Sequence, residues 1–151
     1  MSSTALNAAL SAAGVSAEIS EELIGAVARV APSDVVDALT ALRDGDAAFT
    51  MLVDLFATDT GERLEITYHL RSFARDEDAY VRVPVEYDGE VPSVWQVFPS
   101  ALYPEREAAE LFGLAFPGHP NPKRLLTTDE VELPLLRKST PIRTEEEVHD
   151  R

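Results

Sequence analysis

Residues 103–126 have the sequence YPEREAAELFGLAFPGHPNPKRLL, the most informative stretch of the 151-residue chain. It predicts a short helix with Pro104 at the first helical position, where a missing backbone N–H costs nothing. Gly113 suits the left-handed position just past the end of that helix. A proline-punctuated segment follows. We interpret the stretch as a docking element, and the rest of the chain as a small domain that holds it.

The charge distribution sets this stretch apart. The chain has a net charge of −14, from 13 Lys and Arg against 27 Asp and Glu. Residues 105–128 carry three acids and three bases, which gives a net charge of zero. A balanced, partly apolar segment on an acidic protein suits a protein–protein contact. The alternative is that some part of any acidic chain must be less acidic than the rest. The acidic balance argues against nucleic acid as a partner, because phosphate binding needs clustered Lys and Arg.

Length and composition favour one domain with one core, since 45% of the residues are hydrophobic. We expect a single domain over residues 1–141 and an acidic exposed tail over 142–151. The chain has no cysteine, which excludes disulfides and cysteine-ligated zinc or iron–sulfur sites within it. The N-terminus lacks the basic start and apolar run of a signal peptide. No stretch reaches the ~18 apolar residues of a membrane span, so we expect a soluble, cytoplasmic chain.

The other elements follow from helix caps and from the period of the apolar residues. In chain order they are a loosely attached helix at 4–13 capped by Thr4, a strand ending near Ala31, a helix at 33–43 capped by Ser33, and strands at 49–57, 64–71 and 80–86. Residues 15–31 also fit a helix that starts at Ser20, and we favour the strand because residues 26–31 alternate and end at a proline. Residues 49–57 are apolar on both faces, which predicts a central strand.

These elements predict an α+β fold. Three strands form an antiparallel meander, and the strand near Ala31 brings the sheet to four. The helix at 33–43 covers one face. The acidic run 76–78 is expected to be a solvated loop, and the short helix and an extended C-terminal segment follow the sheet.

The opening stretch contains charged side chains but no catalytic set. Glu105 and Glu107 are two positions apart on the predicted helix and point in different directions, so they cannot act as paired carboxylates. Arg106 and Glu110 are four apart and are expected to pair. His119 has no second ligand at metal spacing, so we expect it to donate to a carbonyl of a loop or a partner.

Asp54 is the oddest single position, because it stands within an apolar strand and a buried aspartate needs a partner. We expect it to have a structural role. The sequence has no glycine-rich phosphate loop and no serine in a nucleophile elbow.

The same stretch resembles the signature of a known family. Glu105-Arg106-Glu107, then Glu110, two apolar residues, six more positions and His119 are similar to the signature of the C subunit of respiratory NADH-quinone oxidoreductase (complex I). The similarity extends to Gly113-Leu114-Ala115-Phe116, to Gly118-His119-Pro120, and upstream to about residue 30. The sequence departs from the family pattern in having Lys123, followed by Arg124, at an arginine position, Ala101-Leu102-Tyr103 for A-N-W, and Ser139 for a closing aspartate.

The resemblance implies a non-catalytic subunit without its own cofactor. It would dock on the hydrogenase-like large subunit and the other hydrophilic-arm subunits, and support electron transfer from NADH or another donor to quinone, coupled to ion translocation. Iron–sulfur clusters, with flavin or nickel–iron, would lie in those partner subunits. The complex would hold the chain on the cytoplasmic face of the plasma membrane.

The signature also implies the interface residues, and two other functions stay open. The expected interface residues are Glu105, Arg106, Glu107, Glu110, Phe112, Gly113, His119, Lys123 and Arg124. The first alternative is the equivalent small subunit of a membrane-bound [NiFe] hydrogenase. The more remote one is a free-standing enzyme or acidic α+β binding domain with a pocket at Asp54 or His119.

Overall fold

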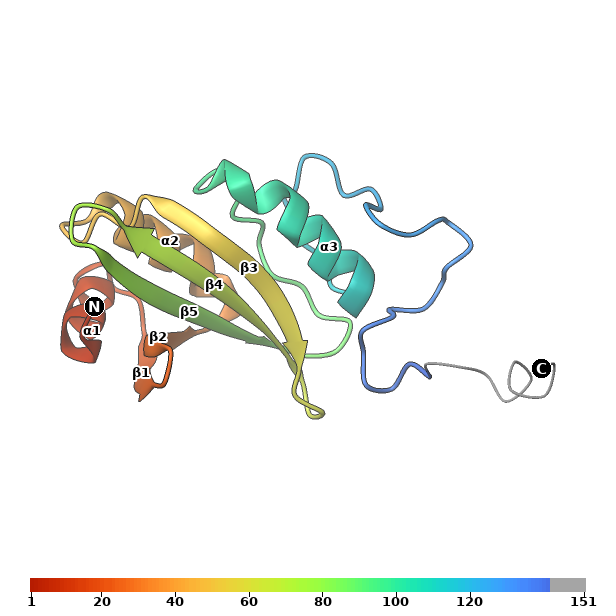
Figure 1. The fold of residues 1–151 in the computed structure, drawn as a ribbon, viewed down its shortest axis with the longest axis horizontal. Helices are drawn as coiled ribbons and strands as arrows, with labels where there is room; N and C mark the ends of the chain where they lie inside the picture. Colours follow the sequence, from red (N-terminus) through yellow and green to blue (C-terminus); the bar gives the residue numbers. More distant parts are fainter. Residues whose placement is uncertain (142–151) are drawn as a thin grey trace.

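The structure is a computed structural model that describes residues 1–141 (Figure 1). The expected acidic tail at 142–151 lies outside the described residues. In chain order the elements are α1 (Ser3–Ala12), β1 (Ala17–Glu22), β2 (Gly25–Val30), the 3-10 turn η1 (Pro32–Asp34), α2 (Val35–Asp44), β3 (Met51–Asp59), β4 (Leu64–Ser72), β5 (Glu77–Val85), the 3-10 turn η2 (Pro99–Ala101) and α3 (Leu102–Phe112).

The strands form one sheet in the order β1-β2-β5-β4-β3, which confirms the α+β class. The predicted antiparallel meander of β3, β4 and β5 is present. The strand expected near Ala31 is β2, and it joins β5 in parallel. A fifth strand arises because the region around Ser20 pairs with β2 as a hairpin and does not start a helix.

The prediction that residues 49–57 form a central strand is wrong, because β3 lies at the edge of the sheet. Its outward apolar side chains stay accessible, and Phe56 is 45% exposed. The ladder to β4 shifts register between Leu52 and Asp54, as in a β-bulge. Asp54 is exposed, and its carboxylate accepts the N–H of Leu55 at 2.8 Å. Asp54 is therefore not buried, contrary to what its place in an apolar strand had suggested, and the structural role expected for it stays a prediction.

Two helices bury their apolar stripes in the core. Leu6 and Leu10 of α1 are fully buried, and the loose attachment expected for this helix stays a prediction. Ser2, not Thr4, caps α1, because its hydroxyl accepts the N–H of Ala5 at 3.3 Å. The residues of α2 that are buried are Val35, Ala38, Leu39 and Leu42.

The start of α2 also differs from the prediction. Ser33 does not cap this helix, since it lies within η1 and its hydroxyl donates to Asp34 instead.

The polar face of the sheet carries ion pairs. Arg29 and Arg82 both lie within 4 Å of the carboxylate of Glu65. Asp78, expected in a solvated loop, belongs to β5, because it lies opposite Arg71 of β4 and accepts a hydrogen bond from its guanidinium at 2.6 Å. The pairing of β5 with β4 therefore starts at Glu77, before the first residue of the strand predicted at 80–86.

Candidate docking site

The helix of the opening stretch is α3, which packs against β3 (Figure 1). It begins at Leu102, after η2, so Pro104 is its third residue and not its first. The proline is tolerated there because the first four N–H groups of a helix have no partner within the helix. Gly113 ends the helix with φ 70° and ψ 38°, as predicted.

Glu105 is fully buried, which sequence reasoning missed. Its carboxylate accepts hydrogen bonds from the Ser93 hydroxyl at 2.5 Å and from the Val94 N–H at 2.7 Å. Burial raises the pKa of Glu105 despite these donors. The fully buried Tyr68 has no hydrogen-bond partner for its hydroxyl within residues 1–141, and burial, with the charge of Glu105, raises its pKa. Through its hydrogen bonds with Ser93 and Val94, Glu105 ties α3 to the loop that precedes it.

His119 behaves as expected, because its side chain binds a backbone carbonyl. Its Nε2 lies 2.8 Å from the carbonyl oxygen of Leu102, and its Nδ1 accepts the N–H of Asn121 at 3.0 Å. These two partners assign the donor role to Nε2 and the acceptor role to Nδ1. The ring also lies 3.9 Å from the carboxylate of Glu105.

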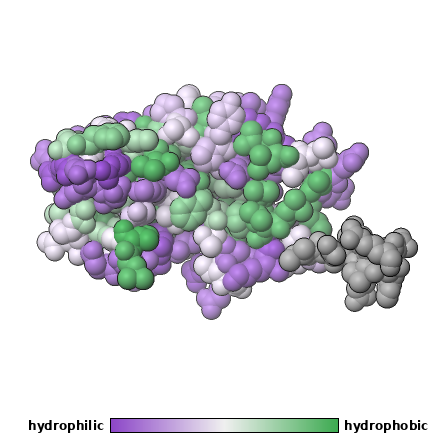
Figure 2. Space-filling view, in the orientation of Figure 1, coloured by the Kyte–Doolittle hydropathy of each residue, from purple (hydrophilic) through white to green (hydrophobic). Residues whose placement is uncertain are grey.

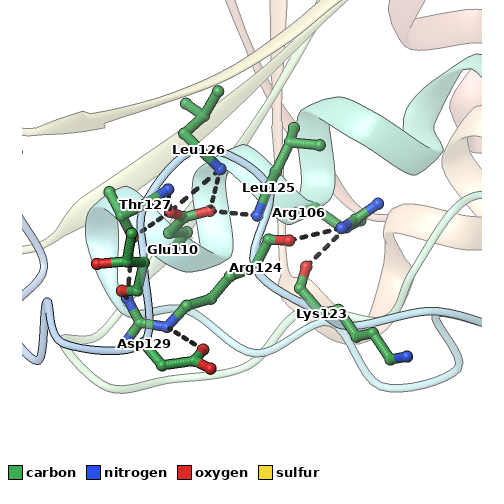
Figure 3. A network of polar contacts seen from close by, with 9 residues as sticks. Arg106, Glu110, Lys123, Arg124, Leu125, Leu126, Thr127 and Asp129 are labelled. Carbon is green, nitrogen blue, oxygen red and sulfur yellow. Dashed lines mark hydrogen bonds and ion pairs between the residues drawn. The ribbon is translucent and has the colours of Figure 1, made fainter.

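The predicted pair of Arg106 and Glu110 does not form, because both side chains bind backbone groups of a later segment (Figure 3). We call that segment, residues 120–138, the strap. Arg106 donates to the carbonyls of Lys123 and Arg124 at 2.7 Å each. Glu110 accepts the N–H groups of residues 125–127 and the hydroxyl of the last of these.

We call Arg106 and Glu110, with these strap contacts, the clasp. An irregular segment has backbone donors and acceptors that need partners, and the clasp supplies them from one face of α3. Burial alone would raise the pKa of Glu110, but the Thr127 hydroxyl and the N–H donors outweigh it and lower that pKa to about 2. Glu110 thus holds the strap as a carboxylate.

The strap is fixed a second time at the C-terminal end of α3. The N–H of Leu136 donates to the carbonyl of Leu111 at 2.9 Å. Arg137 donates to the carbonyl of Phe112 at 2.6 Å and to Asp88 at 2.8 Å. A guanidinium suits the last carbonyls of a helix, but Arg137 lies 25 positions after Phe112, so no local sequence signal pointed to this role.

Asp59 anchors the end of the strap and was also missed. It accepts the Tyr87 hydroxyl at 2.6 Å and the N–H of Lys138 at 2.8 Å. These two donors, the hydroxyl first, hold the pKa of Asp59 below its usual value.

Although its backbone is held at these places, the strap displays apolar side chains to the outside. Figure 2 shows apolar residues gathered over the C-terminal end of α3 and the adjoining strap. The exposed large side chains of the strap are Leu126, Leu133, Leu135 and Leu136. A groove of about 270 Å³ lies between β3 and α3, and Leu136 lines it from the strap. Exposed apolar surface of this kind commonly marks an interaction site.

The nine predicted interface residues have unequal access to a partner. Glu105 and Phe112 are buried. Arg106, Glu110 and His119 use their polar atoms within the chain. Arg124 is exposed, but its guanidinium also binds within the strap, to Thr127 and Thr128. The remaining ones are the half-buried Gly113 and the exposed Glu107 and Lys123. Whether any of the nine contacts a partner stays a prediction.

The part of the chain that the structure describes offers neither a metal site nor a membrane span. Within residues 1–141, no three His, Asp or Glu side chains converge as ligands for a metal ion. None of the helices there is long and apolar enough to cross a membrane.

Comparison with known proteins gives the family. The sequence profile described as respiratory-chain NADH dehydrogenase, 30 kDa subunit, matches residues 28–146. The chain belongs to this family. The stretch that resembles the family signature, residues 105–124, lies within this match.

Three proteins that are similar in sequence to this member of the 30 kDa subunit family are named as the C subunit of NADH-quinone oxidoreductase. One from Phenylobacterium zucineum is 40% identical over 111 residues, 72% of this chain and 53% of the relative. One from Ruegeria pomeroyi is 40% identical, with 74% and 58% covered. One from Caulobacter vibrioides is 41% identical, with 77% and 60% covered. The chain thus spans little more than half the length of these relatives.

A solved structure has a similar fold. It is described as the membrane-bound sulfane sulfur reductase (MBS), an archaeal respiratory membrane complex. The TM-score is 0.77 at 23% sequence identity, with 92% of this chain and 85% of that chain covered. At this identity the likeness concerns the fold alone.

Proposed function

We propose that this chain is a non-catalytic subunit of a complex I-like quinone reductase, and that it docks on the hydrogenase-like large subunit of the hydrophilic arm. Membership of the 30 kDa subunit family supports the type of assembly. The relatives at about 40% identity are named as subunits of an NADH-quinone oxidoreductase.

The observation that carries the docking role is the leucine surface of the strap. Leu133 and Leu135 are exposed, although the strap that bears them is tied to the fold on both sides. A segment already held by backbone hydrogen bonds loses little conformational freedom on binding, so more of its contact energy contributes to affinity. The clasp thus serves docking indirectly, by fixing the surface that a partner meets.

In this proposal the redox chemistry belongs to the neighbours. Iron–sulfur clusters, with flavin or nickel–iron, lie in the partner subunits, and electrons pass through them to quinone while ions are translocated. This chain holds its neighbours in place at the cytoplasmic face of the membrane. Its own polar groups orient the docking surface.

Purification of the native assembly tests the proposal. An affinity tag on this chain, used on gently solubilised membranes, is expected to bring down a hydrogenase-like large subunit and other redox subunits. A nickel-ligating cysteine set in that large subunit would assign the chain to a hydrogenase, and its absence would favour quinone reduction. Recovery of a monomeric chain that is active alone would overturn the proposal in favour of a free-standing domain.

A further inference from the structure

The groove between β3 and α3 has the features of a site for an extended polypeptide. β3 is an edge strand, and no other strand of the described chain pairs with its outer side. Such an edge offers backbone donors and acceptors to an incoming segment. The groove floor and walls are largely apolar, formed by Leu55, Phe56, Ala57, Ala108, Leu111, Phe112 and Leu136.

The groove also carries two carboxylates on opposite walls. Asp54 lines it from β3 and Glu107 lines it from α3, and both residues are exposed. Among residues 1–141, neither carboxylate takes part in an ion pair. The most complementary occupant therefore brings a cation together with an apolar side chain.

Charge also decides between the possible occupants. A second copy of this chain would bring the same two carboxylates and a net charge of −14 to the same edge. The end of this chain is unsuitable as well, because residues 145–147 are three consecutive glutamates. Like charges placed together oppose both arrangements.

We infer that the groove binds an extended segment of a partner subunit in which an aliphatic side chain neighbours an arginine or lysine. The aliphatic side chain fills the apolar groove, and the cation lies between Asp54 and Glu107. Arginine fits this place best, since its planar guanidinium can serve two carboxylates and is weakly hydrated. This inference rests on the proposed function, because the segment comes from the same assembly.

Removal of the two charges in the native complex is the first test. The variant Asp54→Asn/Glu107→Gln keeps an oxygen acceptor for the N–H of Leu55 and keeps the shape of both side chains. We expect its retention in the assembly at about 50 mM NaCl to fall about tenfold, and we expect added salt to weaken the retention of the wild-type chain more than that of the variant. The control Glu18→Gln/Glu62→Gln removes two exposed carboxylates elsewhere and should behave as wild type. Equal retention of both double variants would overturn the inference.

A photo-cross-linking amino acid at Phe56 identifies the occupant. A benzoylphenylalanine there replaces an exposed aromatic side chain, and the same residue at the exposed Phe73 serves as control. We expect position 56 alone to cross-link to another subunit, within three residues of an Arg or Lys. A product with a second copy, with a segment lacking a base, or no product from an intact complex would overturn the inference. If the wild-type chain brings down no redox subunit at all, the proposed function itself fails, which distinguishes the two failures.

Discussion

Glu105 is fully buried at 0% exposure, and burial raises the pKa of its carboxyl. As pH rises from the ordinary value of 4.5 through the raised value, the folded state keeps a proton that the unfolded state has lost. Stability therefore falls across that window. We expect Glu105→Gln to remove this dependence, so that wild type gains stability relative to the variant as pH falls from about 8 to 5. Urea unfolding of the wild type and the variant at both pH values measures this change in relative stability.

Two further variants make the Glu105 test specific. Glu105→Leu leaves the N–H of Val94 without an acceptor in a buried place, which should cost about 1–3 kcal/mol at either pH. Glu107→Gln changes an exposed carboxylate two positions away and should leave the pH dependence as in wild type. A parallel pH profile for wild type and Glu105→Gln would show that the carboxyl titrates normally.

Glu110 has the opposite behaviour, since its pKa is lowered to about 2. Its stabilisation of the strap is fully present above the ordinary pKa of 4.5 and is lost as pH falls through about 2. We expect Glu110→Gln to reduce hydrogen-exchange protection of the amides of residues 125–127 by about tenfold to a hundredfold at pH 7. The wild-type protection of the same amides should approach that of the variant near pH 2.

The strap itself offers a control for this measurement. Glu130→Gln changes an exposed carboxylate of the same segment, and protection should stay unchanged. If Glu110→Gln left the three amides as protected as before, the clasp would not depend on the carboxylate.

Among the single residues, the sequence predicted that His119 binds a backbone carbonyl, because its glycine and proline neighbours keep it in a loop. It could not find the burial of Glu105, whose partners Ser93 and Val94 come from a separate loop. The four-residue spacing of Arg106 and Glu110 suggested a mutual pair. The backbone groups of residues 123–127 lie in an irregular segment, and they compete for both side chains.

Among the elements, alternation predicted β4 and the buried face of β5 because side chains point to opposite sides of a strand at every second residue. Whether a strand lies at the centre or at the edge of a sheet cannot be predicted from such a local pattern. Residues 49–57 suggested a centre because both faces are apolar, whereas Phe56 faces an open surface of an edge strand. The hairpin of β1 and β2 was missed in part because Ser20 and its acidic neighbours also suit a helix start.

The end of α3 provides a prediction at the scale of elements. Gly113 has φ +70°, and a Cβ there would meet the guanidinium Nη2 of Arg137 at 2.8 Å. Gly118 has φ +86°, but a Cβ there would meet nothing within 4 Å. Alanine costs about 1–2 kcal/mol of backbone strain at either site. We expect Gly113→Ala to lose more than this, because the displaced Nη2 of Arg137 donates to Asp88 and to the carbonyl of Gly113.

Urea unfolding of the two alanine variants measures their difference, and trypsin reports the local effect. Cleavage after Arg137 should be faster in Gly113→Ala than in Gly118→Ala, since a released side chain reaches the protease more easily. Equal stability and equal cleavage would mean that Arg137 adjusts without losing its contacts.

At the scale of the whole molecule, exposed apolar side chains lie on the strap, on the edge strand β3 and on the turn between β1 and β2. The turn between β1 and β2 carries Leu23 and Ile24, at the opposite end of the molecule from the strap (Figure 1). This turn precedes residue 28, where the family match begins. The strap leucines lie within the family match, and Leu136 among them lines the groove. The proposed docking role therefore concerns the strap and not the turn.

A matched pair of double variants separates these two surfaces. Leu133→Ser/Leu135→Ser and Leu23→Ser/Ile24→Ser each replace two exposed aliphatic side chains, so each should change the free energy of unfolding by less than about 0.5 kcal/mol. Because apolar anchors dominate the affinity of protein interfaces, we expect the strap variant alone to lose about tenfold or more of its retention in the purified assembly. The measurement is the ratio of large subunit to tagged chain after washing. Loss with the turn variant and retention with the strap variant would place the docking surface at the β1–β2 end.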